Sequence, residues 1–356
     1  MRNILVTGGA GFVGSNLGQY WKRDHPEDRV IALDNLKRRG SEITLRRLEK
    51  CGIEFVHGDV RNREDLETLS EVNLILECSA EPSVQSGYNG DPRYLINTNL
   101  SGTLNCLELA RMRNARFVFL STSRVYPIHS VRNLPYGENE SRFFLPPGKK
   151  GVGWYEAGIS ENFPMDGSRS LYGATKLSSE LFVAEYAAMY GMQAIVNRCG
   201  VLTGPWQMGK VDQGFVTLWA SQFLYGGKLN YTGFGGLGKQ VRDILHVSDL
   251  YELLKIQLQD MPKYSGRIFN VGGGQGNSIS LLELSQLCEA MSKKSLKLDS
   301  NPETHPADIP WYVTDNTRVQ RDSGWAPKKS VEMILEEVFQ WLVDYRSDLE
   351  GLLVQR

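Results

Sequence analysis

The stretch Val6-Thr7-Gly8-Gly9-Ala10-Gly11-Phe12-Val13-Gly14 joins two patterns of different period. The apolar run at residues 4–7 predicts a strand, and residues 12–24 carry the spacing of an amphipathic helix. Glycine at this turn permits a tight bend and lets backbone amides approach a pyrophosphate at the positive end of the helix. We therefore predict a dinucleotide-binding turn whose ligand contacts are Gly8, Gly11, Phe12, Val13 and Gly14.

A carboxylate ends the next predicted strand, residues 30–34. Asp34 follows Gly14 by twenty residues, which is where a carboxylate accepts hydrogen bonds from the ribose hydroxyls of a dinucleotide. Its negative charge disfavours a 2′-phosphate, so the sequence predicts NAD rather than NADP. The basic run Lys37-Arg38-Arg39 is the opposing signal, but a charge run is more often a solvated face.

Strand and helix patterns alternate along the first two hundred residues. Further strands are predicted at residues 53–56, 74–78, 117–121 and 194–198, and helices at 91–113 and 171–190. Such alternation is typical of right-handed crossovers and of a parallel sheet covered on both faces. The predicted fold class is α/β, a Rossmann-type doubly wound parallel sheet with a smaller C-terminal substrate-binding lobe.

The expected domain boundaries follow from where this alternation stops. We assign residues 1–200 to the dinucleotide-binding domain, to which the chain returns at about 240–275, and 201–239 with 276–356 to the substrate lobe. Residues 127–170 are rich in Pro, Gly and Glu. A connection of that length is usually functional or ordered by a ligand.

Composition excludes several classes of protein. Lys+Arg number 40 and Asp+Glu 41, a balance that argues against nucleic-acid binding and against a polybasic membrane-surface protein. No apolar run approaches a bilayer span, and the first strand begins so early that no signal peptide is expected. The 5 cysteines form no Cys-x-x-Cys pair and the 5 histidines no paired ligand spacing, so we expect a cytoplasmic protein without a metal.

Three side chains form a candidate catalytic group. Tyr172 and Lys176 are spaced to share one face of the predicted helix, and an ammonium near a phenol stabilises the phenolate. Thr122 directly follows the predicted strand at 117–121, at the sheet edge where ligands of parallel sheets bind. Together they support removal of a hydroxyl proton while the same carbon is oxidised by NAD.

The Gly-x-x-Gly-x-x-Gly spacing after Thr7 resembles the extended short-chain dehydrogenase/reductase superfamily, in its NAD-dependent epimerase/dehydratase family. Gly58-Asp59-Val60 is similar to the adenine contact, Ser79-Ala80-Glu81 to the segment beside the nicotinamide ribose, and Asn99 to a residue that braces the sheet. The resemblance implies these cofactor contacts beside the glycine turn: Asp34, Asn35, Asp59, Val60, Ser79, Ala80, Asn99, Ser121, Tyr172, Lys176 and Cys199.

Two positions after Thr122 distinguish reactions within the family. Some dehydratases of the family carry Asp-Glu there to eliminate water, whereas this chain carries Ser123 and Arg124. The missing acid pair argues against 4,6-dehydration.

The run at 197–214, with those at 158–176 and 238–247, is similar to epimerases of CDP-linked sugars. That resemblance implies C2 epimerisation of a CDP-deoxyhexose, of the CDP-paratose to CDP-tyvelose type, through a 2-keto sugar. It also implies a role in lipopolysaccharide O-antigen biosynthesis and a homodimer or homotetramer. The expected substrate contacts are Ser123, Arg124, Asn197, Lys210, Gln213, Arg242 and His305.

Two departures leave the substrate open. His305 stands where the family often has a phosphate-gripping arginine, and Val201 where many relatives carry an asparagine. One alternative is therefore a UDP-sugar 4-epimerase or decarboxylase of the same superfamily. Another is a catalytically silent NAD-binding protein, against which the intact Thr122, Tyr172 and Lys176 count.

Overall fold

The computed structural model describes residues 1–88, 90–210 and 213–354, which divide into two compact units. Unit 1 comprises residues 1–125, 170–199 and 250–269, and unit 2 comprises 126–169, 200–249 and 270–356. The second unit is therefore about as long as the first. Segment 126–169, placed by the sequence in the dinucleotide-binding domain, belongs to unit 2 because its short strands pair and pack there.

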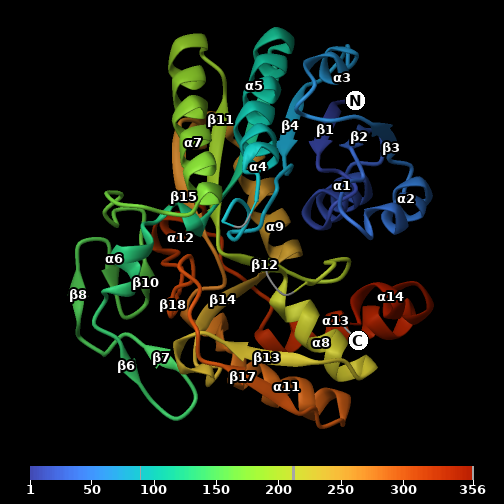
Figure 1. Ribbon diagram of the computed structural model, residues 1–356. Helices are drawn as coiled ribbons and strands as arrows, with labels where there is room; N and C mark the ends of the chain where they lie inside the picture. Colours follow the sequence, from blue (N-terminus) through green and yellow to red (C-terminus); the bar gives the residue numbers. More distant parts are fainter. Residues whose placement is uncertain (89, 211–212, 355–356) are drawn as a thin grey trace. The chain divides into compact units, whose positions relative to one another are not determined.

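Unit 1 is built on a seven-stranded sheet in the order β15-β11-β5-β4-β1-β2-β3 (Figure 1). Neighbouring strands from β3 to β11 run parallel. The strands are β1 Asn3–Thr7, β2 Arg29–Asp34, β3 Glu54–His57, β4 Leu74–Glu77, β5 Arg116–Thr122, β11 Ala194–Cys199 and β15 Arg267–Val271. The α/β class and the predicted strands are confirmed, with boundary shifts of one residue or a few.

Helices connect these strands, with α5 and α7 side by side in Figure 1. They are α1 Phe12–Asp24, α2 Ser41–Lys50, α3 Arg63–Glu67, α4 Arg93–Ile96, α5 Gly102–Arg113, α7 Leu171–Tyr190, α9 Val247–Gln259 and α10 Met261–Tyr264. The single helix predicted at 91–113 is α4 and α5 joined by a π-helical turn, Asn97–Ser101. A short 3-10 turn, Ser123–Val125, follows β5.

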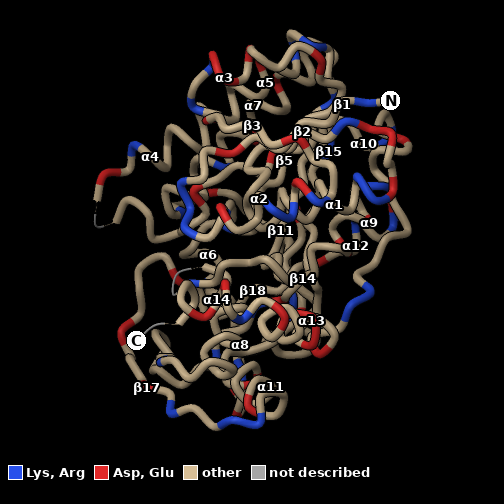
Figure 2. Tube along the Cα trace, turned by 90° about the vertical axis from the view of Figure 1, so that its right-hand side faces the viewer, with Lys and Arg blue, Asp and Glu red and all other residues tan. Residues whose placement is uncertain are grey.

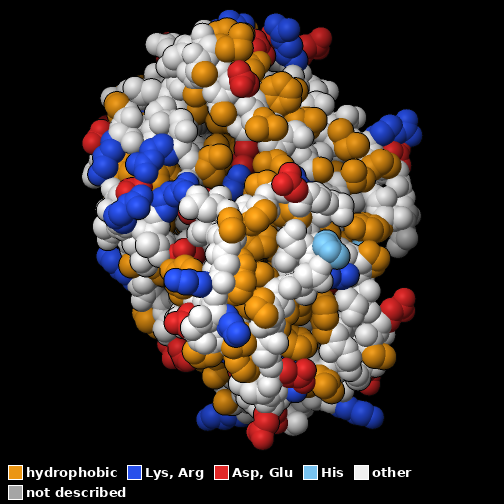
Figure 3. All heavy atoms as spheres, turned by 90° about the vertical axis from the view of Figure 1, so that its left-hand side faces the viewer, with side chains coloured by type: hydrophobic (Ala, Val, Ile, Leu, Met, Phe, Trp, Pro, Cys, Tyr) orange, Lys and Arg blue, Asp and Glu red, His pale blue; other side chains and the backbone are white. Residues whose placement is uncertain are grey.

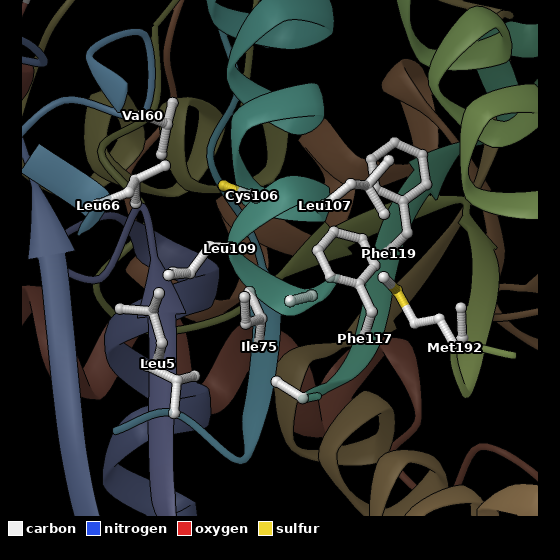
Figure 4. Packing of buried hydrophobic residues seen from close by; sticks show 14 of the residues in the cluster. Leu5, Val60, Leu66, Ile75, Cys106, Leu107, Leu109, Phe117, Phe119 and Met192 are labelled. Carbon is white, nitrogen blue, oxygen red and sulfur yellow. The ribbon is translucent and has the colours of Figure 1, made fainter. Parts of the chain in front are cut away.

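The core of unit 1 lies between the sheet and these helices. In Figure 4, Phe117 and Phe119 of β5 lie beside Leu107 of α5, and Ile75 of β4 lies nearby. All four side chains are fully buried. Their packing fixes α5 against the strands whose carboxyl ends carry the candidate site.

Unit 2 contains short strands and its own helices. A sheet joins β12, β14 and β16, with β18 also paired to β14, and a second sheet joins β8, β9 and β10. The strands are β6 Gly137–Glu138, β7 Phe143–Phe144, β8 Lys150–Gly151, β9 Trp154–Tyr155, β10 Gly158–Ile159, β12 Val201–Thr203, β13 Leu229–Thr232, β14 Val241–His246, β16 Ser278–Ser280, β17 Leu298–Asn301 and β18 Trp311–Tyr312. The helices are α6 Ile128–Arg132, α8 Phe215–Tyr225, α11 Leu281–Ser292, α12 Thr317–Ser323, α13 Val331–Asp344 and α14 Arg346–Leu353.

Surface charge is mixed, in keeping with a net charge of −1. Basic and acidic residues alternate along the trace of both units in Figure 2. On the face shown in Figure 3, hydrophobic side chains reach the surface in scattered groups between polar and charged ones. None of the helices that the structure describes is long and apolar enough to cross a bilayer.

Candidate active site

The glycine turn between β1 and α1 has the backbone that its sequence predicts. Gly8 adopts a positive φ of 62°, and a Cβ on Gly14 would lie 2.3 Å from the carbonyl oxygen of Gly8. Gly11 precedes α1, and no side chain of the described residues caps the first turn of this helix. Helix N–H groups without a side-chain cap form a site for an anion, so this turn fits the diphosphate of a dinucleotide.

Asp34 is held in place at the end of β2. Its carboxylate oxygens accept hydrogen bonds from the backbone N–H of Ala10 at 3.1 Å and of Leu36 at 2.8 Å. Burial raises the pKa of Asp34, while these backbone hydrogen bonds oppose the rise. The carboxylate is thus an acceptor of fixed orientation, as recognition of a ribose requires.

Asn35 and Asp59 continue this edge of the site. The Asn35 amide donates to Asp59 Oδ2 at 2.9 Å, and Arg61 forms an ion pair with the same carboxylate. Burial acts to raise the pKa of Asp59, but the hydrogen bonds from Arg61 and Asn35 outweigh it and lower the pKa to about 2. In the basic run, Lys37 Nζ lies 3.3 Å from the ring centroid of Tyr94, a cation–π contact.

Thr122 and Tyr172 meet at the carboxyl end of β5. Thr122 Oγ1 accepts from the backbone N–H of Arg124 at 3.1 Å, and the Thr122 hydroxyl acts on the Tyr172 phenol by lowering its pKa. Burial raises the pKa of Tyr172 to about 12, while the Thr122 hydroxyl and the Arg124 charge act to lower it. The predicted phenol–threonine pair is therefore brought together in the structure.

Lys176 lies one helical turn beyond Tyr172 on α7. Its Nζ is 3.7 Å from Glu77 Oε2 and 4.0 Å from the ring centroid of Phe119. Both side chains of the ion pair are buried, and burial raises the pKa of Glu77 to about 7 although the Lys176 charge lowers it. Sequence reasoning missed Glu77. The available signal was a lone acid ending the apolar run of β4.

Several predicted cofactor contacts brace the site. The fully buried Asn99 accepts from the N–H of Glu81 at 2.8 Å and donates to its carbonyl at 3.0 Å. The backbone N–H of Ser79 donates to Thr7 Oγ1, and Ala80 beside it is half-buried. These contacts fix the segment after β4, so Asn99 acts through the backbone of its neighbours.

A buried network joins β5, α7 and β11. Ser121 donates to Glu180, and Arg198 makes a bidentate pair with the same carboxylate, with Nη2–Oε2 at 2.7 Å. The Ser121 hydroxyl therefore donates to Glu180, and its contact with the cofactor stays a prediction.

Three further predicted contact residues lie in the interior of unit 1. The Asn197 amide exchanges two hydrogen bonds of 2.9 Å with Gln257, and both side chains are fully buried. Asn197 is therefore not available to a substrate, which corrects that prediction. Val60 packs in the core, and burial raises the pKa of the Cys199 thiol to about 12.

The predicted substrate contacts in unit 2 are Lys210, Gln213, Arg242 and His305. Arg242 Nη2 donates to Asp308 Oδ1 at 2.9 Å and to the Ile309 carbonyl, so the guanidinium has a structural partner. His305 Nδ1 accepts from the N–H of Ala307 at 3.1 Å. Lys210 and Gln213 form an antiparallel bridge. Arg242 is thus tied through Asp308 to the segment that holds His305.

Metal ligands are not gathered anywhere in the part of the chain that the structure describes. No group of three or more His, Cys, Asp or Glu residues suited to a metal ion occurs there. The chemistry of the site is that of a phenol, a threonine hydroxyl and an ammonium beside a turn that fits a dinucleotide.

Comparisons with a family profile, with known sequences and with solved structures show which proteins this chain resembles. The profile of the NAD dependent epimerase/dehydratase family matches residues 4–272. The chain is 30% identical to CDP-paratose 2-epimerase of Salmonella typhi, over 95% of this chain and 98% of that protein. It is 25% identical to UDP-glucuronate 4-epimerase 4 of Arabidopsis thaliana, over 97% of this chain and 76% of that protein. A crystal structure of dTDP-glucose 4,6-dehydratase from Bacillus anthracis in complex with NAD superposes with a TM-score of 0.77 at 26% identity, covering 99% and 100% of the two chains.

Proposed function

The chain belongs to the NAD dependent epimerase/dehydratase family, and we propose that it is an epimerase acting at C2 of a CDP-linked deoxyhexose. The observation that carries the epimerase assignment is the Thr122–Tyr172 pair with Lys176 one turn away and Arg124 in place of an acid. The similarity to a CDP-paratose 2-epimerase over nearly the whole chain supports C2 as the reacting carbon and CDP as the nucleotide. The proposed conversion is of the CDP-paratose to CDP-tyvelose type.

Each residue of the site has a defined part in this proposal. Tyr172, as phenolate, removes the proton of the sugar hydroxyl, and the Thr122 hydroxyl shares that proton. Lys176 holds the nicotinamide ribose and keeps a positive charge beside the phenol. When bound, NAD supplies the redox chemistry by accepting hydride from the sugar carbon and returning it.

The residues proposed to hold the dinucleotide lie in unit 1. The glycine turn, Asp34 and Asp59 hold the dinucleotide, which is regenerated at each turnover and stays bound. The nucleotide of the substrate must be gripped while its sugar turns. For that grip the candidates in unit 2 are Lys210, Gln213, Arg242 and His305.

A second copy of the chain is the proposed partner. Leu181, Phe182 and Met189 of α7 are 64%, 41% and 68% exposed. An apolar helix face of this kind is suited to burial against a copy of itself. We propose a homodimer through this face, and Met189→Glu shifts the mass measured by light scattering to that of a monomer if the face is the interface.

Isotope effects test the reacting carbon. The purified chain is incubated with CDP-paratose deuterated at C2 and, separately, at C4. A kinetic isotope effect at C2 alone supports the proposal, since the C2–H bond breaks during oxidation. An effect at C4 alone indicates oxidation at C4, as in a 4-epimerase. No turnover of any CDP- or UDP-sugar, with NAD bound, indicates a silent NAD-binding protein.

The phenol is tested by Tyr172→Phe. We expect turnover to fall by roughly 10²-fold or more while nucleotide and NAD still bind, because only proton transfer is lost. Tyr20→Phe on α1 is the matched control and keeps full turnover. Acid denaturation of the wild-type chain releases NAD(H), measured by chromatography. Near-normal turnover of Tyr172→Phe would remove the phenol from its proposed role.

A further inference from the structure

Two buried ion pairs involve α7, and they differ in how well they are satisfied. Glu180 accepts from Arg198 Nε at 3.0 Å and Nη2 at 2.7 Å, and also from Ser121. Glu77 has only a 3.7 Å approach to Lys176 Nζ, which is longer than a hydrogen bond. The Glu180 carboxylate is therefore satisfied by hydrogen bonds, whereas the Glu77 carboxylate is not.

Glu77 is enclosed at the end of β4, between β1 and β5. Its side chain is fully buried, and neither carboxylate oxygen has a hydrogen-bond partner among the described residues. On β5, Phe119 is in register with Glu77. The Lys176 Nζ lies 4.0 Å from the centroid of the Phe119 ring. The ammonium is therefore located by a carboxylate and by an aromatic face.

Such an arrangement costs free energy of folding rather than supplying it. A buried carboxylate without hydrogen bonds keeps its desolvation penalty, and buried ion pairs are often no more stabilising than apolar side chains of the same size. The long contact has a different advantage. It attracts the ammonium without committing one of its three N–H donors to the carboxylate, so those donors can serve another acceptor.

We infer that Glu77 is a positioning residue that holds the Lys176 ammonium at the cofactor-binding edge of the sheet. This inference rests on the proposed role of Lys176 and is independent of which sugar is turned over. Glu77 contacts neither the phenol nor a ligand in this assignment. It acts through the lysine.

Four other ionisable groups among the described residues interact with Glu77. They are Lys176 and Tyr172 from α7, Cys106 from α5 and the adjacent Cys78. Burial raises the pKa of both thiols well above their ordinary range and that of Tyr172 to about 12. A change at Lys176 with a midpoint near pH 7 is therefore assigned to Glu77.

Nuclear magnetic resonance of the lysine provides the first test. The full-length chain is labelled with ¹⁵N-lysine, and the Lys176 Nζ signal is identified by its loss in Lys176→Met. We expect this signal to shift with pH at a midpoint near 7 and to lose that step in Glu77→Gln. The matched control is Asp28→Asn, which removes another buried, ion-paired carboxylate of unit 1 and keeps the step.

Binding and kinetics provide the second test. We expect Glu77→Gln to weaken NAD binding, measured by equilibrium dialysis, by about tenfold, the size of one displaced charge-assisted contact. In the NAD-saturated enzyme, kcat falls while KM for the sugar stays within twofold. Glu77→Asp restores the charge and part of the affinity. A merely structural role would lower thermal stability in Asp28→Asn and Glu77→Gln alike without this division.

Two results would overturn the inference. One is a wild-type Lys176 signal without a step between pH 5 and 9, which needs no variant to fold. The other is unchanged NAD affinity in Glu77→Gln. Failure of the proposed sugar reaction is separate, because it would leave the Lys176 step and the NAD affinities as expected.

Discussion

Asp34 and Glu77 end two strands at the same edge of the sheet, but their carboxylates differ in hydrogen bonding. Asp34, at the end of β2, accepts backbone hydrogen bonds from both sides. Glu77, at the end of β4, has no hydrogen-bond partner among the described residues and depends on Lys176. The first is built as a ready acceptor for a neutral ribose, and the second as a counter-ion. Position along a sheet edge therefore does not determine the role of an acid, but its satisfied or unsatisfied oxygens do.

Removal of the ammonium should have the largest effect on this comparison. In Lys176→Met, Glu77 stays buried without its counter-ion, so we expect the free energy of unfolding at pH 8 to fall by about 3 kcal/mol. Turnover falls by roughly 10³-fold, because the phenol loses its cation. Urea denaturation and steady-state kinetics measure the two effects.

The double variant Lys176→Met/Glu77→Gln separates them. Stability returns toward the wild-type value because the unpaired charge is gone, whereas turnover does not recover. A double variant no more stable than Lys176→Met would show that Glu77 carries no charge at that pH.

The Asp34 side of the comparison predicts a pure binding effect. In Asp34→Ala we expect the Kd for NAD to rise by roughly 30-fold, since hydrogen bonds to a charged acceptor are lost. The Lys176 signal and its step near pH 7 stay unchanged, because the effect is confined to the end of β2. A shifted Lys176 signal in Asp34→Ala would mean that the two acids are coupled and would break the comparison.

Glu77 should make the free energy of unfolding depend on pH. Burial raises its pKa from 4.5 to about 7, so its contribution to stability is present below pH 4.5 and is lost as the pH rises through 7. Relative to Glu77→Gln, the wild type should lose on the order of 2–3 kcal/mol between pH 4.5 and 8. Denaturation curves of both proteins at several pH values measure this difference. A difference that stays flat across the window contradicts the assigned titration.

Local spacing explains what the sequence could predict. The glycine turn and the pair Tyr172 and Lys176 lie within one turn or one helix, so backbone geometry alone brings their parts together. Thr122 was predictable because it ends a strand of a parallel sheet. The confirmed α/β fold follows from the same short-range periodicities.

Long-range contacts explain what it could not. Glu77 and Lys176 meet only because β4 pairs with β5 and α7 packs on that face. Asn197 was misassigned because its motif gives its place along β11 but not its direction. Alternate side chains of a strand face opposite sides, so Asn197 meets Gln257 of α9 while Arg198 meets Glu180 of α7.

The smallest expected effect is that of replacing Arg124, whose charge acts on the Tyr172 phenol. Its charge lowers the pKa of Tyr172, whereas the Glu77 charge raises it, so the phenol lies under two opposed influences. In Arg124→Gln we expect the alkaline rise of kcat to move up by about half a pH unit, which is roughly threefold in kcat at a fixed pH. Arg124→Lys keeps the charge and should keep the profile. In Glu77→Gln the same limb should move in the opposite direction, because the negative charge is removed, while the maximal kcat is lower because Lys176 is no longer held in position. Shifts of the same sign in both variants would mean that electrostatics at the phenol are not set by this pair, and the contrast between an acceptor and a counter-ion would lose its catalytic meaning.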